Sequence, residues 1–375
     1  MYAFLCADSA IEAIRHLSAR GEWEGRPAWP DAPRLLPVWG ECVCNQRSFK
    51  EYLGRADLGA IGVIRRPVDL LVPSSHLRSA GKSAKFRVWS RPVPAGSCRR
   101  LARDLVVCGP EFAITQLAGS FGKFNELFDD FAEEVHGQVE VLESLGKPDE
   151  FVAEFPHRWE QTRRLAALAA TACELAGTYR LQGPGQGVAY GAAPVMTVSG
   201  LRDFAATACR GPASGRARAI ADLALDGSAS PMETALALML TMPVELGGFG
   251  IKKPLLNVAV DTSVLEDALR SRDSVTPDML WPDQKVALEY DSSEFHARKG
   301  AQQAEHDAAR SNMLSLMGYR VLRATTRGVS SLPGVALLAR QIAFLLEEPL
   351  REPTPLEAQR RSKLFGELMP RLTGE

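Results

Sequence analysis

Two acidic residues on one expected strand, Glu289 and Asp291, are the side chains of this sequence best suited to metal chemistry. The run 285–291 alternates polar and apolar residues, which is typical of a β-strand. At a period of two, Glu289 and Asp291 share a face with Lys285, opposite the apolar residues. Carboxylates two residues apart on a strand project side by side, so this face offers a compact group of oxygen donors.

A third acid, Asp278, lies on the extended run before this strand. The segment between the two runs suits a reversal because Pro282 is followed by Asp283. A hairpin of this kind would bring Asp278 next to Glu289. Crowded carboxylates repel one another and are expensive to bury, and Mg²⁺, which prefers one or two carboxylates plus waters and phosphates, relieves both costs. Carboxylates on a hairpin are otherwise often only a solvated face, and spacing alone leaves both interpretations open.

Two helices are expected on either side of the hairpin. The sequence Ser-Pro-Met-Glu at 230–233 predicts a helix start, with Ser230 at the N-cap and Glu233 as a capping-box partner. A second helix is predicted from about Ala301 to Met317. It carries Asp307 and Arg310, which are three residues apart and therefore share a face.

The order of these motifs matches a known superfamily. The chain has a helix with Ser-x-x-Glu, then Asp…Glu-x-Asp on a hairpin, Phe-His, Asp-x-x-Arg on a helix, and Gly-Tyr-Arg-Val-Leu-Arg on an alternating strand. This order resembles the PD-(D/E)XK nuclease superfamily, and it looks most like the branch around the very-short-patch repair endonucleases. The resemblance implies a restriction-endonuclease-like αβββαβ core that acts on DNA.

The resemblance also implies roles for individual residues. Asp278 and Glu289 would be ligands of Mg²⁺ or Mn²⁺, and Glu233 stands where a helix-borne acid often completes the site. Arg310 and Arg323 are the candidates for binding substrate phosphate. Arg310 could hold the scissile phosphate with two hydrogen bonds, or it could pair with an acid on its own helix.

The residue that activates water is left open by the resemblance, because Asp291 stands where the superfamily usually has Lys. His296 is the best substitute general base, since imidazole titrates near neutrality. Lys285, on the same strand face as Asp291, is a weaker candidate.

The whole chain of 375 residues is expected to be of the α/β (α+β) class with more than one domain. Its N-terminal half should contain a small sheet followed by helices. The predicted divisions are 1–120 (small α/β domain), 121–229 (helical connecting region), 230–348 (nuclease-like domain) and 349–375 (tail). The predicted N-terminal strands are 59–64, 69–72, 85–89 and 104–108.

The N-terminal strands and the phrase Pro-Glu-x-x-x-x-x-Leu-Ala at 110–118 weakly resemble the effector-side domain of AbiEi-type antitoxins. Those proteins neutralise a nucleotidyltransferase toxin, so the resemblance implies a toxin–antitoxin-type system and a protein partner for this half. The winged-helix DNA reader of such antitoxins is not evident in the sequence.

Composition and charge exclude several classes of protein. A hydrophobic content of 46% and a net charge of −1 are ordinary for a folded protein and argue against one that coats nucleic acid non-specifically. No stretch is apolar enough to span a membrane, and the N-terminus lacks the features of a signal peptide. Seven scattered cysteines are typical of reduced thiols, so the expected location is the cytoplasm. The motifs of dinucleotide-binding folds, α/β-hydrolases and zinc metalloproteases are absent from the sequence.

The near-zero net charge conceals two opposite blocks. Ten basic residues between 65 and 103 accompany one acid, and ten acids between 126 and 154 accompany one lysine. The blocks could pair with each other, or the basic one could form a surface for phosphates. The sequence therefore predicts metal-dependent hydrolysis of DNA, in defence, repair or a toxin–antitoxin-type system. The alternative is a catalytically silent nuclease fold that acts as an antitoxin-like or DNA- or protein-binding regulator.

Overall fold

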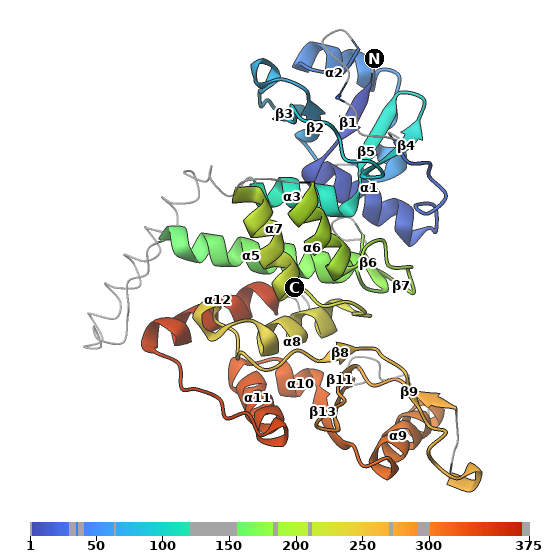
Figure 1. The fold of residues 1–375 in the computed structure, drawn as a ribbon, viewed down its shortest axis with the longest axis vertical. Coiled ribbons are helices and arrows are strands. Elements are labelled where there is room, and N and C mark those ends of the chain that lie inside the picture. Colours follow the sequence, from blue (N-terminus) through green and yellow to red (C-terminus); the bar gives the residue numbers. More distant parts are fainter. Residues whose placement is uncertain are drawn as a thin grey trace. The chain divides into compact units, whose positions relative to one another are not determined.

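The structure is a computed structural model, and it describes residues 2–29, 35–36, 41–63, 65–119, 156–182, 187–208, 212–269, 273–291 and 301–369. Contacts divide the chain into two compact units (Figure 1), each built from two segments. The first unit comprises Met1–Lys123 and Glu174–Asp222, and the second comprises Phe124–Cys173 and Leu223–Glu375. Helices and mixed sheets occur together, which confirms the predicted α/β class. Within the described ranges, no helix has the length and apolar character needed to cross a membrane.

The first unit is organised on a five-stranded mixed sheet with strand order β3-β2-β1-β5-β4. β1 pairs with β5 and β2 with β3 in parallel, while β1 with β2 and β4 with β5 are antiparallel. The strands are β1 (Ala3–Leu5), β2 (Val68–Val72), β3 (Ala84–Val88), β4 (Cys98–Ala102) and β5 (Leu105–Cys108). The helices are α1 (Ala7–Ala19), α2 (Gln46–Leu53), α3 (Pro110–Gly119), α6 (Val198–Thr207) and α7 (Pro212–Leu223), with the hairpin β6 (Tyr179–Leu181) and β7 (Val188–Tyr190) and the 3₁₀ turns η1 (Gly59–Ile61) and η2 (Ser75–Leu77).

One predicted strand of this unit is wrong. Residues 59–61 of the predicted strand 59–64 form the 3₁₀ turn η1, which ends at Gly62 with a φ of 81°. A backbone in this left-handed region interrupts an extended strand and favours glycine. The strands β1 and β4 were not predicted, because β1 has three residues and β4 carries a run of arginines that does not read as a buried strand.

The second unit contains a four-stranded sheet with order β13-β12-β11-β8. β12 and β13 are parallel, and the other neighbours are antiparallel. The strands are β8 (Leu255–Leu256), β11 (Met279–Trp281), β12 (Val286–Asp291) and β13 (Arg320–Thr325), with the side ladder β9 (Val260–Asp261) and β10 (Ser274–Val275). The helices are α8 (Pro231–Thr241), α9 (Ala301–Leu316), α10 (Thr326–Val329), α11 (Leu332–Leu346) and α12 (Pro355–Leu368), with the 3₁₀ turns η5 (Val244–Leu246) and η6 (Asp267–Leu269). A further helix, α5 (Pro156–Leu175), crosses the boundary between the two units along the chain.

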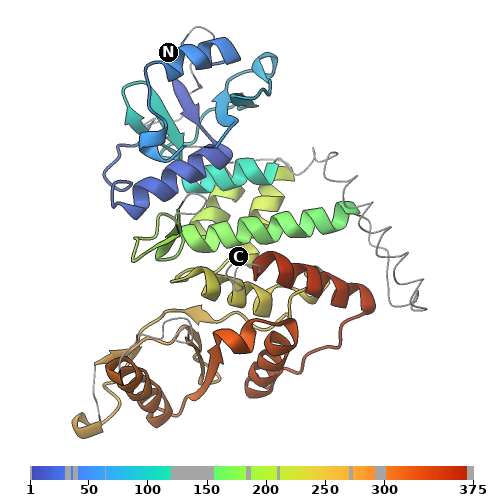
Figure 2. The ribbon, with the colours of Figure 1, turned by 180° about the vertical axis from the view of Figure 1, so that it is seen from behind.

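With the separate ladder β9–β10 set aside, the order α8-β8-β11-β12-α9-β13 matches the predicted helix, three strands, helix and strand. α8 begins where expected, because the Ser230 hydroxyl accepts the backbone N–H of Glu233 at 3.1 Å. Helix α9, drawn in orange, lies alongside the sheet (Figure 2). Met313 and Leu314 of α9, with Met317 just after it, pack with Leu280 and Ala287 of the sheet. Alternation along β12 therefore places every second residue after Ala287 on the face that α9 covers.

Candidate functional site

The two acids singled out by the sequence, Asp278 and Glu289, meet at one end of the β11–β12 ladder. Met279 pairs with Leu288, so the next position along sets Asp278 opposite Glu289. Oδ2 of Asp278 accepts the backbone N–H of Tyr290 at 2.5 Å. The Asp278 carboxylate thus lies against the peptide bond that joins Glu289 to Tyr290.

Glu289 is buried on the α9 face of the sheet, with 4% of its surface exposed. The alternative that Glu289 belongs to a solvated polar face is therefore wrong. A buried carboxylate requires a compensating charge, and Arg310 of α9 supplies it by donating from Nη2 to Oε2 of Glu289. The Arg310 side chain is 30% exposed, so it stands between Glu289 and solvent. Its Nε is buried and has no hydrogen-bond partner among the described residues.

Arg323 and Asp291 extend the same neighbourhood along the sheet. Arg323 is the register partner of Glu289 on β13, and neighbouring strands lie about 4.8 Å apart. Arg323 is exposed, and its Nη2 donates to Oγ of Ser311 on α9 at 2.8 Å. Asp291 is half-buried and follows Glu289 by two residues, at the end of β12. The ladder end therefore carries acids and two guanidinium groups on one face.

Glu233 reaches this region through Asn257, a residue that the sequence analysis did not single out. The Asn257 side-chain amide donates to Oε2 of Glu233 at 2.7 Å, and its backbone N–H donates to the Asp278 carbonyl at 3.1 Å. Glu233 also accepts the Ala229 N–H at 3.0 Å and the Ser230 hydroxyl at 3.1 Å. Glu233 is thus a capping carboxylate whose helix is tied to the strand that carries Asp278. The backbone of Asn257 has a positive φ of 51°, a feature that the sequence does not show and that could not have marked this residue in advance.

Lys285 lies at the other end of β12. It occupies the β11–β12 turn with a φ of 50°, and its Nζ donates to the Met317 carbonyl at the end of α9, at 3.1 Å. Four residues of strand separate it from Glu289, which is about 13 Å at the usual rise. Lys285 therefore holds α9 rather than joining the acids. His296, the other predicted base, lies outside the described residues.

The donor set fits a hard divalent cation in part. Among the described residues, no group of three or more His, Cys, Asp or Glu side chains is arranged to hold a metal ion. Mg²⁺, however, commonly uses only one or two carboxylates and keeps several waters. Asp278 and Glu289 offer that number of carboxylates. Arg310 competes with a cation for Glu289, so metal binding requires that its guanidinium move.

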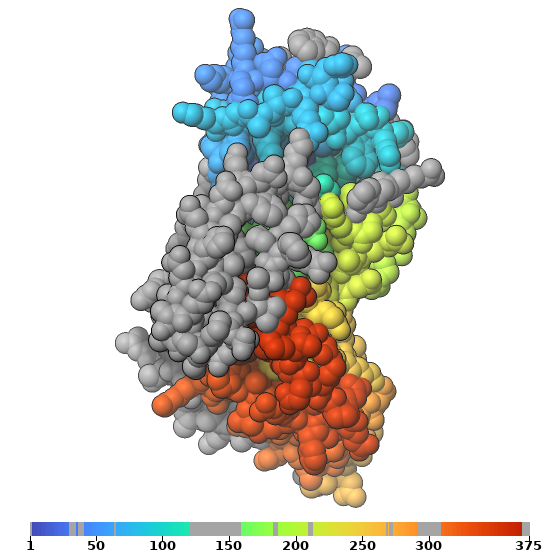
Figure 3. Space-filling model, turned by 90° about the vertical axis from the view of Figure 1, so that its left-hand side faces the viewer, coloured from blue at the N-terminus to red at the C-terminus, as the bar shows by residue number. Residues whose placement is uncertain are grey.

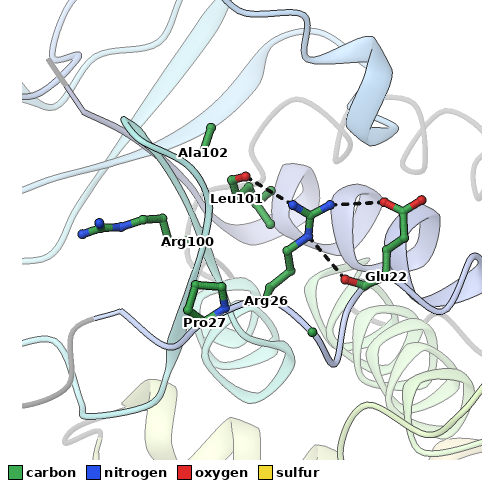
Figure 4. A pocket seen from close by; sticks show the side chains of 7 residues that line it. Glu22, Arg26, Pro27, Arg100, Leu101 and Ala102 are labelled. Atoms are coloured by element: carbon green, nitrogen blue, oxygen red, sulfur yellow. Dashed lines mark hydrogen bonds and ion pairs between the residues drawn. The ribbon is translucent and has the colours of Figure 1, made fainter.

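A separate hollow of about 400 Å³ lies on the first unit, between β4 and the segment that covers the edge of this strand. Figure 4 shows that Arg26 bonds to Glu22 and to the Leu101 carbonyl, while Arg100 points away from it. The two cations do not converge, and Arg26 is already paired. The hollow therefore offers no grouping of side chains that indicates a ligand.

Comparisons with known proteins do not assign the chain to a family. No known family model matches it, and neither curated proteins nor solved structures give a significant match. The nuclease and antitoxin resemblances rest on the sequence motifs alone.

Proposed function

We propose that the second unit hydrolyses phosphodiester bonds in DNA with the help of Mg²⁺ or Mn²⁺. The observation that carries this proposal is the juxtaposition of Asp278 and Glu289 at one ladder end, with Arg310 and Arg323 on the same face. Asp278 and Glu289 would hold the cation, which when bound polarises a phosphate and lowers the pKa of a water molecule.

The arginines would bind the substrate. A guanidinium group matches the geometry of a phosphate and donates two parallel hydrogen bonds to it. Arg323 is exposed at the ladder end and is steadied by Ser311. Arg310 would exchange its ion pair with Glu289 for the scissile phosphate, because its partly exposed side chain and its partnerless Nε leave it capacity to donate.

Nicking of supercoiled plasmid DNA in Mn²⁺ or Mg²⁺ tests the proposal. Asp278→Asn and Glu289→Gln should each lower the rate by roughly 10²-fold or more, because each removes a charged ligand of the cation. The matched control is Asp283→Asn, which removes a carboxylate from the turn of the same hairpin, where the Asp283 side chain is 74% exposed. Equal rates in wild type and Asp278→Asn would refute the catalytic assignment.

A second candidate function is a silent nuclease fold that serves as an antitoxin-like or DNA- or protein-binding regulator. Two observations favour it: Arg310 neutralises Glu289, and Asp291 stands where the superfamily has its lysine. Calorimetric titration with Mn²⁺ separates the candidates. An active enzyme should show one site that is lost in both Asp278→Asn and Glu289→Gln, whereas a silent fold should bind no cation there.

A further inference from the structure

A small pocket in the second unit lies between α11, α12 and the loop that joins them. Its volume is about 90 Å³, and its lining includes Phe249, Arg340, Arg351, Glu352 and Arg361. A space of this size has room for several water molecules. One phosphate group needs a space of this order. The pocket is distinct in sequence and lining from the group around Asp278 and Glu289.

Arg361 of α12 lines this pocket and forms no ion pair with a described residue. Its guanidinium lies over the Phe249 ring, 4.2 Å from the ring centre, and Nη2 donates to the Gly248 carbonyl at 3.0 Å. Its Nε is buried and has no hydrogen-bond partner in the described part of the chain. Burial lowers the pKa of Arg361, while the charges of Glu357 and Glu352 act in the opposite direction. A buried N–H donor with no acceptor is costly, so Arg361 favours an anionic acceptor.

The charged residues around the pocket leave two of its three arginines without an ion pair to a described residue. Arg351 is paired with Glu357, with hydrogen bonds of 2.6 and 2.8 Å between them, and it also lies 3.6 Å from the Glu245 carboxylate. Arg340 is exposed, and its side chain forms no hydrogen bond or ion pair with any described residue. Glu352 is the one carboxylate in the lining, and it is exposed. Arg340 and Arg361 are therefore the arginines of this lining that form no ion pair with a described residue.

An aromatic residue continues this surface along α11. Phe344 follows Ala336 and Arg340 in the same row of the helix, at intervals of four residues. Its side chain is 80% exposed, which is unusual for a residue of this size. The orange-to-red surface in Figure 3 belongs to this C-terminal part of the chain. Exposed aromatic rings beside arginines suit a single strand of nucleic acid, because each base has a face that stacks.

We propose that Arg340 and Arg361 bind a backbone phosphate of a single-stranded nucleic acid in this pocket, and that Phe344 stacks against a neighbouring base. Arg351 contributes by holding the loop between α11 and α12 through Glu357. The proposal does not depend on hydrolysis at Asp278 and Glu289. It describes a second contact with nucleic acid that would operate equally in an active nuclease or in a silent one.

The test is fluorescence anisotropy of a labelled oligothymidylate with the full chain, in EDTA so that no cleavage interferes. Arg340→Gln should weaken binding roughly tenfold or more, since it removes a charge-assisted hydrogen bond. It should also reduce the dependence of log affinity on log salt by about 0.7, the value for one phosphate contact on a single strand. Phe344→Ala should weaken binding roughly tenfold through the lost stack. Arg47→Gln is the matched control, because it removes an exposed arginine, with 92% of the side chain accessible, from the first unit.

Each outcome decides the proposal. Arg340→Gln binding as tightly as Arg47→Gln would overturn the phosphate site. If inorganic phosphate binds in calorimetry but the oligonucleotide does not, the pocket is a free-phosphate site and the nucleic-acid assignment fails. If poly-aspartate displaces the oligonucleotide at equal charge, the pocket is not selective for phosphate. Loss of plasmid nicking in Asp278→Asn has no bearing on these results, so failure of the two proposals is distinguishable.

Discussion

Arg310 shows how one side chain decides between two states of the candidate site. Its guanidinium compensates Glu289, which is otherwise a buried carboxylate beneath α9. A metal cation bound to Glu289 would also compensate its negative charge, so the cation and the Arg310 guanidinium compete for this carboxylate. The sequence suggested phosphate or an acid of the same helix as partners for Arg310. The observed partner is set by how α9 docks over the sheet, and no local pattern encodes that docking.

Replacing Arg310 separates these roles. Arg310→Met removes the competing charge and should tighten Mn²⁺ binding about tenfold, equivalent to about 1.4 kcal/mol of charge interaction. The same variant should nick plasmid DNA more slowly, because it lacks the phosphate contact. Calorimetric titration and nicking assays measure the two effects. Arg320→Met, an exposed arginine at the opposite end of β13, is the control. Unchanged or weaker Mn²⁺ affinity in Arg310→Met would contradict the competition.

At the scale of elements, the sequence predicts the helices α8 and α9 and the hairpin between them. The predicted helix 301–317 is observed as Ala301–Leu316, and the predicted start at Ser230 is confirmed by its capping hydrogen bond. These elements are readable because their periodicity and caps are local. The burial of Glu289 is not readable, since the alternation along β12 describes two faces but not what covers each one. The hairpin placed Asp278 and Glu289 together because a tight turn fixes register.

Helix α12 gives a prediction that depends on pH. Glu357 accepts the Thr354 N–H and hydroxyl and pairs with Arg351, and these contacts lower its pKa to about 2 from 4.5. Glu357 therefore stabilises the fold fully above pH 4.5, and this contribution is lost as pH falls toward 2. The difference in Tm between wild type and Glu357→Gln should be largest at pH 7 and smaller at pH 3. Glu352→Gln, an exposed neighbour, is the control, and a difference independent of pH would argue against the ion pair and cap.

At the scale of the whole molecule, the compact units do not follow contiguous stretches of the sequence, whereas the divisions expected from the sequence were contiguous. Segments distant in the chain, Met1–Lys123 and Glu174–Asp222, make one compact unit. Polar contacts join the two segments, among them Arg15 with Glu174 at 2.5 Å and Arg180 with Ser18 at 2.9 Å. In both contacts the partners are more than a hundred residues apart in the sequence, and neither composition nor periodicity predicts such a contact. A boundary drawn from Pro- and Gly-rich stretches alone has no access to this information.

Arg180 should therefore control the stability of the whole first unit. It is fully buried and donates to the carbonyls of Glu174, Gly177 and Ala193, so its loss leaves buried acceptors unsatisfied. Arg180→Leu should destabilise this unit by about 3–5 kcal/mol, as expected when a buried charged network is broken. Hydrogen exchange of the full chain would show faster exchange in β1, β5 and β6 and unchanged exchange in β12 and β13. Arg202→Gln, whose side chain is 47% exposed in its pair with Asp222, should change stability by less than about 0.5 kcal/mol. Equal acceleration in both units, or none in the first, would show that Arg180 does not hold these two segments together.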